Sequence, residues 1–230
     1  MTSSPLAIAG LAVVVGASAL LLRSLHAAFR ERALLQATLL RVCGSGRLTA
    51  REDLVALKKF LNENIRFDPA RRNDPRPLLR HSAAEILTLG QGFCGENARV
   101  AVLLMSAGGV RANRLYLDGP RWGHVIVEHE WDGGWKLFDG HADASVGMTD
   151  EEVGRIDAKD FAALNNTCRA TNPWQNSFRI QLLGRLPLVR RWAALRPPRP
   201  LVFLMESPAL LRALGSLGLL LAGFILVAAA

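Results

Sequence analysis

Two long apolar runs lie at the ends of the chain. Residues 5–22 (PLAIAGLAVVVGASALLL) and 213–230 (ALGSLGLLLAGFILVAAA) each hold eighteen residues without a charge. Because about 20 apolar residues cross the hydrocarbon core of a bilayer, both runs are predicted to be transmembrane helices. A cleaved signal peptide is the alternative for the first run. Signal peptides begin with a positively charged segment, but no Lys or Arg precedes this run.

Between these runs the pattern changes from helical periodicity to the alternation of strands. Capping boxes, of Thr49 with Glu52 and of Ser82 with Glu85, are predicted to open two helices. The predicted helices cover residues 24–42, 49–65, 82–89 and 94–107, and one or two short helices are expected in 149–165. The predicted strands are residues 112–117, 124–131 and 135–139. Helices followed by an antiparallel sheet indicate an α+β domain, with its N-terminal helices packed on the sheet.

The last two strands are joined by Asp132 and Gly133, a strong signal for a two-residue hairpin turn. If these are the central turn residues, Trp131 pairs with Gly134, and counting back sets residue 126 opposite Asp139. Side chains alternate between the faces of a sheet, so His124 and Asp139 are predicted to share a face as diagonal neighbours. A slip of one residue in the turn would place them on opposite faces.

Cys94 follows a glycine-rich turn (GQGFCG) at the start of the predicted helix 94–107. The free N–H groups and the positive end of a helix favour the reactive thiolate, so Cys94 is a candidate nucleophile. The alternative is an inert, buried cysteine, which is the commoner role for an isolated thiol. Beside Cys94, His124 would act as the base and Asp139 would orient the imidazole, an arrangement that serves acyl transfer.

A metal site is a second interpretation of these side chains together with His141. Zinc sites usually draw ligands from closely spaced pairs, and Cys94, His124, Asp139 and His141 are not spaced in this way. We therefore predict neither a metal nor another cofactor. His129 lies on the opposite face of its strand from His124, and His26 and His81 look like ordinary helix or loop residues.

Three motifs in this order resemble the transglutaminase-like superfamily, relatives of the papain-type cysteine peptidases. The strings are GQGFCGENARVAVLLMSAGGVRANRLYL, GHVIVEHEW and GGWKLFD, and the resemblance extends over residues 48–144. It implies that Cys94, His124 and Asp139 form a catalytic triad, with Trp135 in the family's tryptophan position.

The departures from the family pattern bear on the reaction. In animal transglutaminases Trp follows the nucleophile and Gln directly precedes it, whereas here Gly95 follows and Gln91 lies three residues before. Protein cross-linking is therefore not expected, and hydrolysis of a peptide or other amide, or transfer to a small amine, fits the microbial members better. The backbone N–H of Cys94 is the expected oxyanion donor, and Gln91 is a second candidate.

Charge and cysteine content narrow the location and the partners. The formal net charge is +8, and the 24 Arg and 4 Lys are scattered rather than interleaved with aromatic residues, so nucleic acid is not a predicted partner. Three cysteines cannot all pair, which favours a reducing compartment or at least one working thiol. Arginines follow the first apolar run and precede the second. The positive-inside rule therefore places the middle of the chain on the cytosolic side of an inner or plasma membrane.

The predicted organisation is one catalytic domain, residues 23–177, between the two membrane helices. Residues 178–208 form a basic segment that either lies against acidic lipid headgroups or only connects the domain to the second helix. In the loop before His124, Arg121 and Trp122 could bind a carboxylate or an aromatic group of the substrate. An exposed turn of ordinary composition is the alternative.

Two functions follow from these patterns. The first is a membrane-anchored, bacterial-type cysteine acyl hydrolase or acyltransferase that acts on a peptide or amide through a thioester. The second is a catalytically silent module of the same fold that binds a membrane-protein partner as an assembly subunit.

Overall fold

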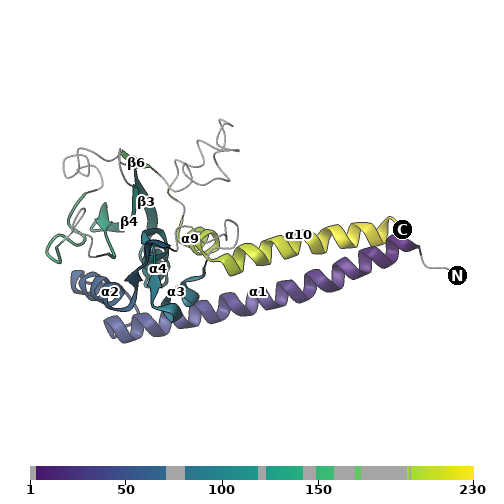
Figure 1. The fold of residues 1–230 in the computed structure, drawn as a ribbon, viewed down its shortest axis with the longest axis horizontal. Coiled ribbons are helices and arrows are strands. Elements are labelled where there is room, and N and C mark those ends of the chain that lie inside the picture. The colour runs from purple at the N-terminus through teal and green to yellow at the C-terminus, as the bar shows by residue number, and fades with distance from the viewer. Residues whose placement is uncertain are drawn as a thin grey trace. The chain divides into compact units, whose positions relative to one another are not determined.

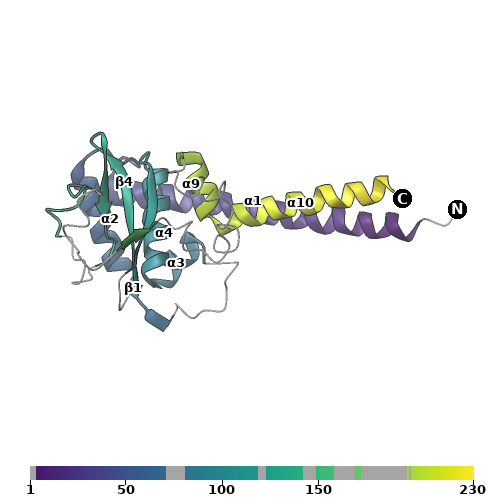
Figure 2. The same ribbon diagram turned by 90° about the horizontal axis from the view of Figure 1, so that it is seen from above.

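The computed structural model describes residues 4–70, 81–118, 123–141, 149–157, 169–171, 196 and 198–230. Within these ranges the chain forms six helices and six strands (Figures 1 and 2). The helices are α1 (Pro5–Cys43), α2 (Arg51–Asn64), α3 (Ala83–Leu89), α4 (Cys94–Ala107), α9 (Arg199–Glu206) and α10 (Pro208–Ala228). The strands are β1 (Arg66–Phe67), β2 (Gln91–Gly92), β3 (Ala112–Asp118), β4 (Gly123–Trp131), β5 (Gly134–Phe138) and β6 (Arg169–Thr171).

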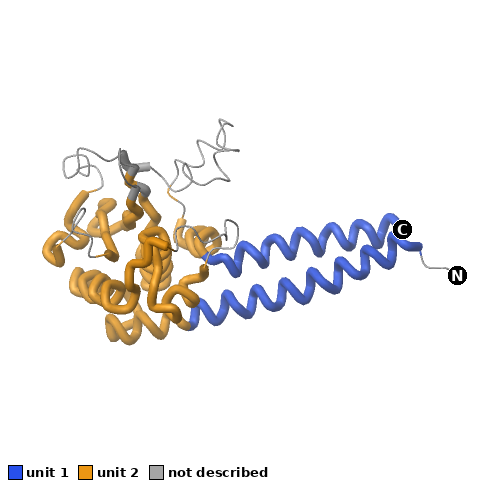
Figure 3. The backbone as a smooth tube through the Cα atoms, in the orientation of Figure 1, with its two compact units in different colours: residues 1–33, 207–230 blue, residues 34–206 orange. Residues whose placement is uncertain are grey.

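The elements divide into two compact units (Figure 3). Residues 34–206 form the larger unit, and residues 1–33 with 207–230 form the smaller one. Helix α1 continues from the smaller unit into the larger, where Leu35 and Leu39 are fully buried in the core.

The larger unit is built on a four-stranded antiparallel sheet in the order β5-β4-β3-β6. The predicted hairpin register is confirmed, since Trp131 pairs with Gly134 and Val127 with Phe138. Asp132 (φ 49°) and Gly133 (φ 73°) both have left-handed backbones, as a two-residue hairpin turn requires. The parallel pair β1-β2 and the strand β6 were not predicted.

Helix α4 forms the centre of the core. It contacts β3 and β4 of the sheet as well as α2 and α3. Its residues from Val100 to Met105 are completely buried, and they share one apolar cluster with Val125, Val127 and Phe138 of the sheet. The α+β class, with helices packed on an antiparallel sheet, is therefore confirmed. Helix α9, which falls in the basic segment 178–208, also packs on α4 and buries Val202 in this core.

The two predicted capping boxes have different outcomes. In α3, the Ser82 hydroxyl accepts the N–H of Glu85 (3.2 Å), and the Glu85 carboxylate accepts the N–H of Ser82 (2.7 Å), as predicted. In α2 the prediction is wrong by one residue. The Asp53 carboxylate, not that of Glu52, accepts the N–H groups of Thr49 (2.7 Å) and Ala50 (2.8 Å), because the helix begins at Arg51.

The smaller unit is a pair of apolar helices, and α1 and α10 are both long and apolar enough to span a membrane. They lie in close contact at Gly10 and Gly223, where an added Cβ would lie 2.8 Å from Val227 and from Val14, respectively. Ala12, Gly16, Gly218 and Ala222 are also small residues spaced four apart, but they lie outside this contact. Both alanines are exposed, and no described atom lies within 4 Å of a Cβ built on Gly16 or Gly218.

Candidate active site

Cys94 is the first residue of α4 and is partly exposed. The carbonyl of Phe93 accepts the N–H groups of Glu96 (2.9 Å) and Asn97 (3.0 Å), so the N–H groups of Cys94 and Gly95 lie at the open, positive end of the helix. The turn before Cys94 is fixed by the pairing of β2 with β1. A thiol at this position has backbone donors beside it and access to solvent.

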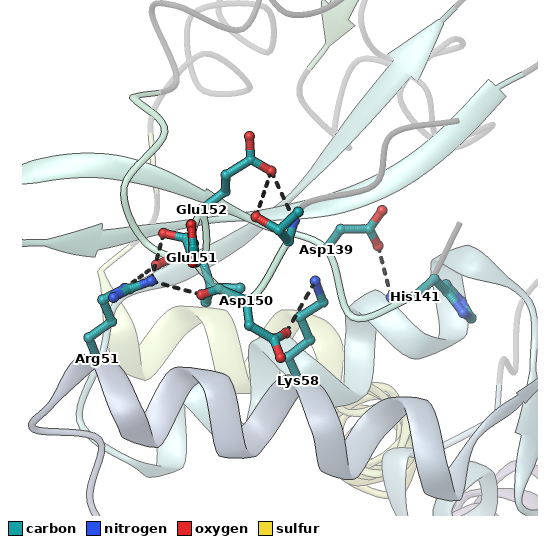
Figure 4. A network of polar contacts seen from close by, with 9 residues as sticks. Arg51, Lys58, Asp139, His141, Asp150, Glu151 and Glu152 are labelled. Carbon is teal, nitrogen blue, oxygen red and sulfur yellow. Dashed lines mark hydrogen bonds and ion pairs between the residues drawn. The ribbon is translucent and has the colours of Figure 1, made fainter. Parts of the chain in front are cut away.

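His124 and Asp139 are buried and bonded to each other. The Nε2 atom of His124 lies 2.9 Å from Oδ2 of Asp139, and only 5% and 1% of the two residues is exposed. The other carboxylate oxygen of Asp139 accepts the backbone N–H of His141 (2.9 Å), a contact drawn in Figure 4. Asp139 occupies Nε2, so the Nδ1 atom of the imidazole remains for the sulfur of Cys94, which also contributes to the raised pKa of His124.

The charge state of His124 follows from these contacts. Burial alone would lower its pKa, but the hydrogen bonds and charges of Asp139 and Cys94 outweigh burial and raise the pKa of His124 to about 10. The imidazole is therefore protonated at neutral pH, between a carboxylate and a sulfur. The structure thus brings the three predicted side chains together, with His124 bonded to Asp139 and under the influence of Cys94.

Cys43 lies in a different environment, outside the predicted membrane span 5–22. Its sulfur is 3.9 Å from the backbone carbonyl of Asp53. Burial, and to a lesser extent the charge of Asp53, raises the pKa of the Cys43 thiol to about 11. Cys43 is therefore protonated at neutral pH and a poor nucleophile. Cys168 lies outside the described residues.

The structure describes only some of the other predicted site residues. Gln91 lies in β2, half-buried and three residues before Cys94. Trp135 lies in β5, where the guanidinium of Arg196 stacks over its ring at 4.2 Å. Arg121 and Trp122 fall outside the described residues, so their role stays a prediction.

Sequence reasoning missed a contact between α4 and the residue after Asp139. The side-chain amide of Asn97 donates to the carbonyl of Gly140 (3.4 Å). A Cβ added at Gly140 would collide with Oδ1 of Asn97 and lie 3.0 Å from Leu61. A larger residue here would require the Asn97 amide or Leu61 to move. The position of Asn97, one helical turn after Cys94, was the available signal, because residues three apart share a helix face.

We therefore expect Gly140→Ala to disturb the site. Overpacking of this kind typically costs about 1–3 kcal/mol of unfolding free energy, and here it would also shift Asp139. Thermal unfolding and the rate at which iodoacetamide alkylates Cys94 should both reveal the change. Gly134→Ala is the matched control, because a Cβ there would be no closer than 3.8 Å to its neighbours. Equal behaviour of the two variants would contradict the assigned contact.

Two other histidines are also defined by the structure. His81 is not an ordinary loop residue, which corrects the sequence interpretation: it is buried, with Nδ1 2.8 Å from Oε1 of Glu96. His129 lies on the sheet face opposite His124, as predicted, and its ring is 6.3 Å from that of Phe138. Burial lowers the pKa of His129 to about 4, so its imidazole is neutral. Within the described ranges, no three His, Cys, Asp or Glu side chains are arranged to hold a metal ion.

A polar network ties the segment 149–157 to α2 (Figure 4). The guanidinium of Arg51 donates to the carbonyls of Asp150 (2.8 Å) and Glu151 (2.6 Å), and Lys58 lies 3.8 Å from the Asp150 carboxylate. These contacts join residues about a hundred positions apart in the chain. They hold residues 149–157, which come after Asp139 in the chain, against α2.

No protein-family model and no curated protein sequence matches the chain. Among solved structures, a proposed cysteine protease from Cytophaga hutchinsonii is 19% identical with a TM-score of 0.41, and the match covers 60% of this chain and 46% of that one. A second, a TGase, is 14% identical with a TM-score of 0.43, and the match covers 59% of this chain and 37% of that one. The chain thus spans less than half the length of either structure.

Proposed function

We propose that this protein is a membrane-anchored, transglutaminase-like cysteine acyl hydrolase or acyltransferase, with Cys94 as nucleophile, His124 as acid and base, and Asp139 as the orienting group. The observation that carries the proposal is the buried Asp139–His124 hydrogen bond next to Cys94, together with the raised pKa of His124. A protonated imidazole beside a sulfur is the resting state of a thiol nucleophile.

The first half of the reaction forms a thioester. The thiolate of Cys94 attacks the carbonyl carbon of a peptide or amide, and the carbonyl oxygen becomes an oxyanion. The backbone N–H of Cys94 donates to that oxyanion, and the side-chain amide of Gln91 is the second candidate donor. As the carbon–nitrogen bond breaks, Nδ1 of His124 gives its proton to the leaving amine.

The second half regenerates the enzyme. His124 takes a proton from water or from a small amine, which attacks the thioester carbonyl. The carbon–sulfur bond then breaks, and the sulfur leaves as the thiolate beside the newly formed imidazolium. Asp139 keeps Nε2 bonded throughout, so the imidazole stays oriented toward the sulfur. Attack by water gives hydrolysis, whereas attack by an amine gives transfer.

The location belongs to the same proposal. The two apolar helices anchor the protein in an inner or plasma membrane, and the basic residues beside them hold the catalytic domain on the cytoplasmic side. The basic segment 178–208 would add contacts with anionic lipid headgroups. A reporter fused after Ala230 that is active only in the cytosol would contradict this orientation.

The experiment that tests the proposed nucleophile compares the cysteines of the folded protein. Iodoacetamide is added below stoichiometry at pH 7, and the alkylated residue is identified by mass spectrometry. Cys94 is expected to react first, and the raised pKa of Cys43 makes that residue the internal reference. Equal alkylation of Cys43, Cys94 and Cys168 would overturn the proposal.

A further inference from the structure

A network of buried charged side chains begins at Glu206, the last residue of α9. Oε1 of Glu206 lies 2.8 Å from Nε of Arg114 in β3, and Oε2 lies 3.3 Å from Nε of Arg99 in α4. No more than 10% of any of these three side chains is exposed. Burial alone would raise the pKa of Glu206, but the charges and hydrogen bonds of Arg114 and Arg99 outweigh burial and lower the pKa, so the carboxylate is ionised.

The same network of polar contacts continues to Phe93, the residue before the nucleophile. The guanidinium of Arg99 donates to the backbone carbonyl of His81 (2.9 Å), and the His81 ring lies 2.8 Å from Oε1 of Glu96. The other oxygen of Glu96 accepts the N–H of Phe93 at 3.3 Å. The path from Glu206 thus runs through hydrogen bonds between buried or half-buried groups as far as Phe93, which is joined to Cys94 by a peptide bond.

Stability alone does not account for such an arrangement. Buried ion pairs rarely stabilise a fold more than apolar residues of the same size would, because desolvation offsets their attraction. Helix α9 is also docked by Val202, which is 2% exposed within the apolar core. This network therefore does more than hold α9 in place: it also fixes the orientation of the backbone around Cys94.

We propose that Glu206 is a positioning residue for Cys94, acting through Arg99, His81 and Glu96 on the turn from which α4 begins. Loss of the Glu206 charge removes one partner of Arg99, so the guanidinium that holds the His81 carbonyl is less firmly fixed, and so is the turn before Cys94. Because Ser207 and α10 follow Glu206 directly in the chain, the reactivity of the thiol depends on the segment that leads into the C-terminal apolar helix. This inference rests on the proposed function, since it takes Cys94 to be the nucleophile.

The test uses the full-length protein in detergent and compares Glu206→Gln with Glu130→Gln. Glu130 also pairs with an arginine, Arg111 at 3.2 Å, but on the surface, which makes it the matched control. The readouts are the second-order rate of Cys94 alkylation by iodoacetamide from pH 6 to 9 and the melting temperature. An ordinary thiol is only a few per cent thiolate at pH 7, which limits how much reactivity a partly displaced Cys94 can lose, so we expect Glu206→Gln to be roughly threefold to tenfold slower. Glu206→Asp should recover part of this rate, and Glu130→Gln should match the wild type.

A second variant keeps the proposal testable if Glu206→Gln does not fold. His81→Gln leaves the contacts between Glu206 and the arginines in place and weakens the link to Glu96, so it should slow alkylation in the same way. If both variants lower the melting temperature while folded protein is alkylated at the wild-type rate, Glu206 has only a structural role. If wild-type Cys94 reacts no faster than Cys43, the proposed function fails first, and the two failures are thus distinguishable.

Discussion

Changing Cys94 to alanine is expected to abolish the burst of p-nitrophenol that follows mixing of the detergent-solubilised protein with p-nitrophenyl acetate. The sulfur of Cys94 displaces p-nitrophenolate and keeps the acetyl group as a thioester, so the wild type should release about one equivalent before slower turnover begins. Stopped-flow absorbance measures the amplitude of this burst. The loss should be complete, because the pKa of about 11 leaves Cys43 protonated at neutral pH.

Cys43→Ser is the matched control and should retain the full burst. A burst that survives in Cys94→Ala would assign the acyl group to another residue.

The cellular phenotype of Cys94→Ala tests the second hypothesis, that the domain is a catalytically silent binding module. If Cys94→Ala leaves the protein's cellular role unchanged, the domain serves as a binding module, and Cys94, His124 and Asp139 have no catalytic use.

Changing His124 to alanine is expected to slow alkylation of Cys94 by about 30-fold at pH 7. An ordinary cysteine is only a few per cent thiolate at that pH, whereas a sulfur paired with an imidazolium reacts as the thiolate. With a pKa of about 10, His124 keeps its proton across the neutral range, so the wild-type rate should be nearly flat between pH 7 and pH 9. In His124→Ala the rate should instead climb about tenfold per pH unit until the thiol is ionised.

His26→Ala is the control for this experiment, since His26 is exposed on α1. Its profile should overlay that of the wild type. A wild-type rate that already rises tenfold per pH unit through the neutral range would show that the imidazolium does not activate the sulfur, and the assigned role of His124 would be wrong.

The hairpin and the three site residues could be read from the sequence because their signals are local. Asp132 and Gly133 set the turn, the turn sets the register, and the register sets the face shared by His124 and Asp139. A run of GQGFCG before an apolar helix likewise places Cys94 at a helix start.

Other features could not be read, because they depend on short segments or on distant contacts. Strands of two or three residues, such as β1, β2 and β6, are too short to show alternation. The predicted start of α2 was wrong by one residue, because Asp53 and Glu52 are both acidic. Only the backbone geometry determines which of the two carboxylates caps the helix. The pairs of Glu206 with Arg99 and Arg114 join residues about a hundred positions apart, which no local pattern reports.

The most direct test of the central claim is to trap the acyl group itself. Detergent-solubilised protein is incubated with p-nitrophenyl acetate or with cell extract, quenched in acid, and digested for mass spectrometry. The account predicts a thioester on Cys94 that hydroxylamine removes and that is absent from His124→Ala treated for the same short time. An acyl group found on Cys43, on Cys168 or on lysine side chains, with residue 94 unmodified, would contradict it.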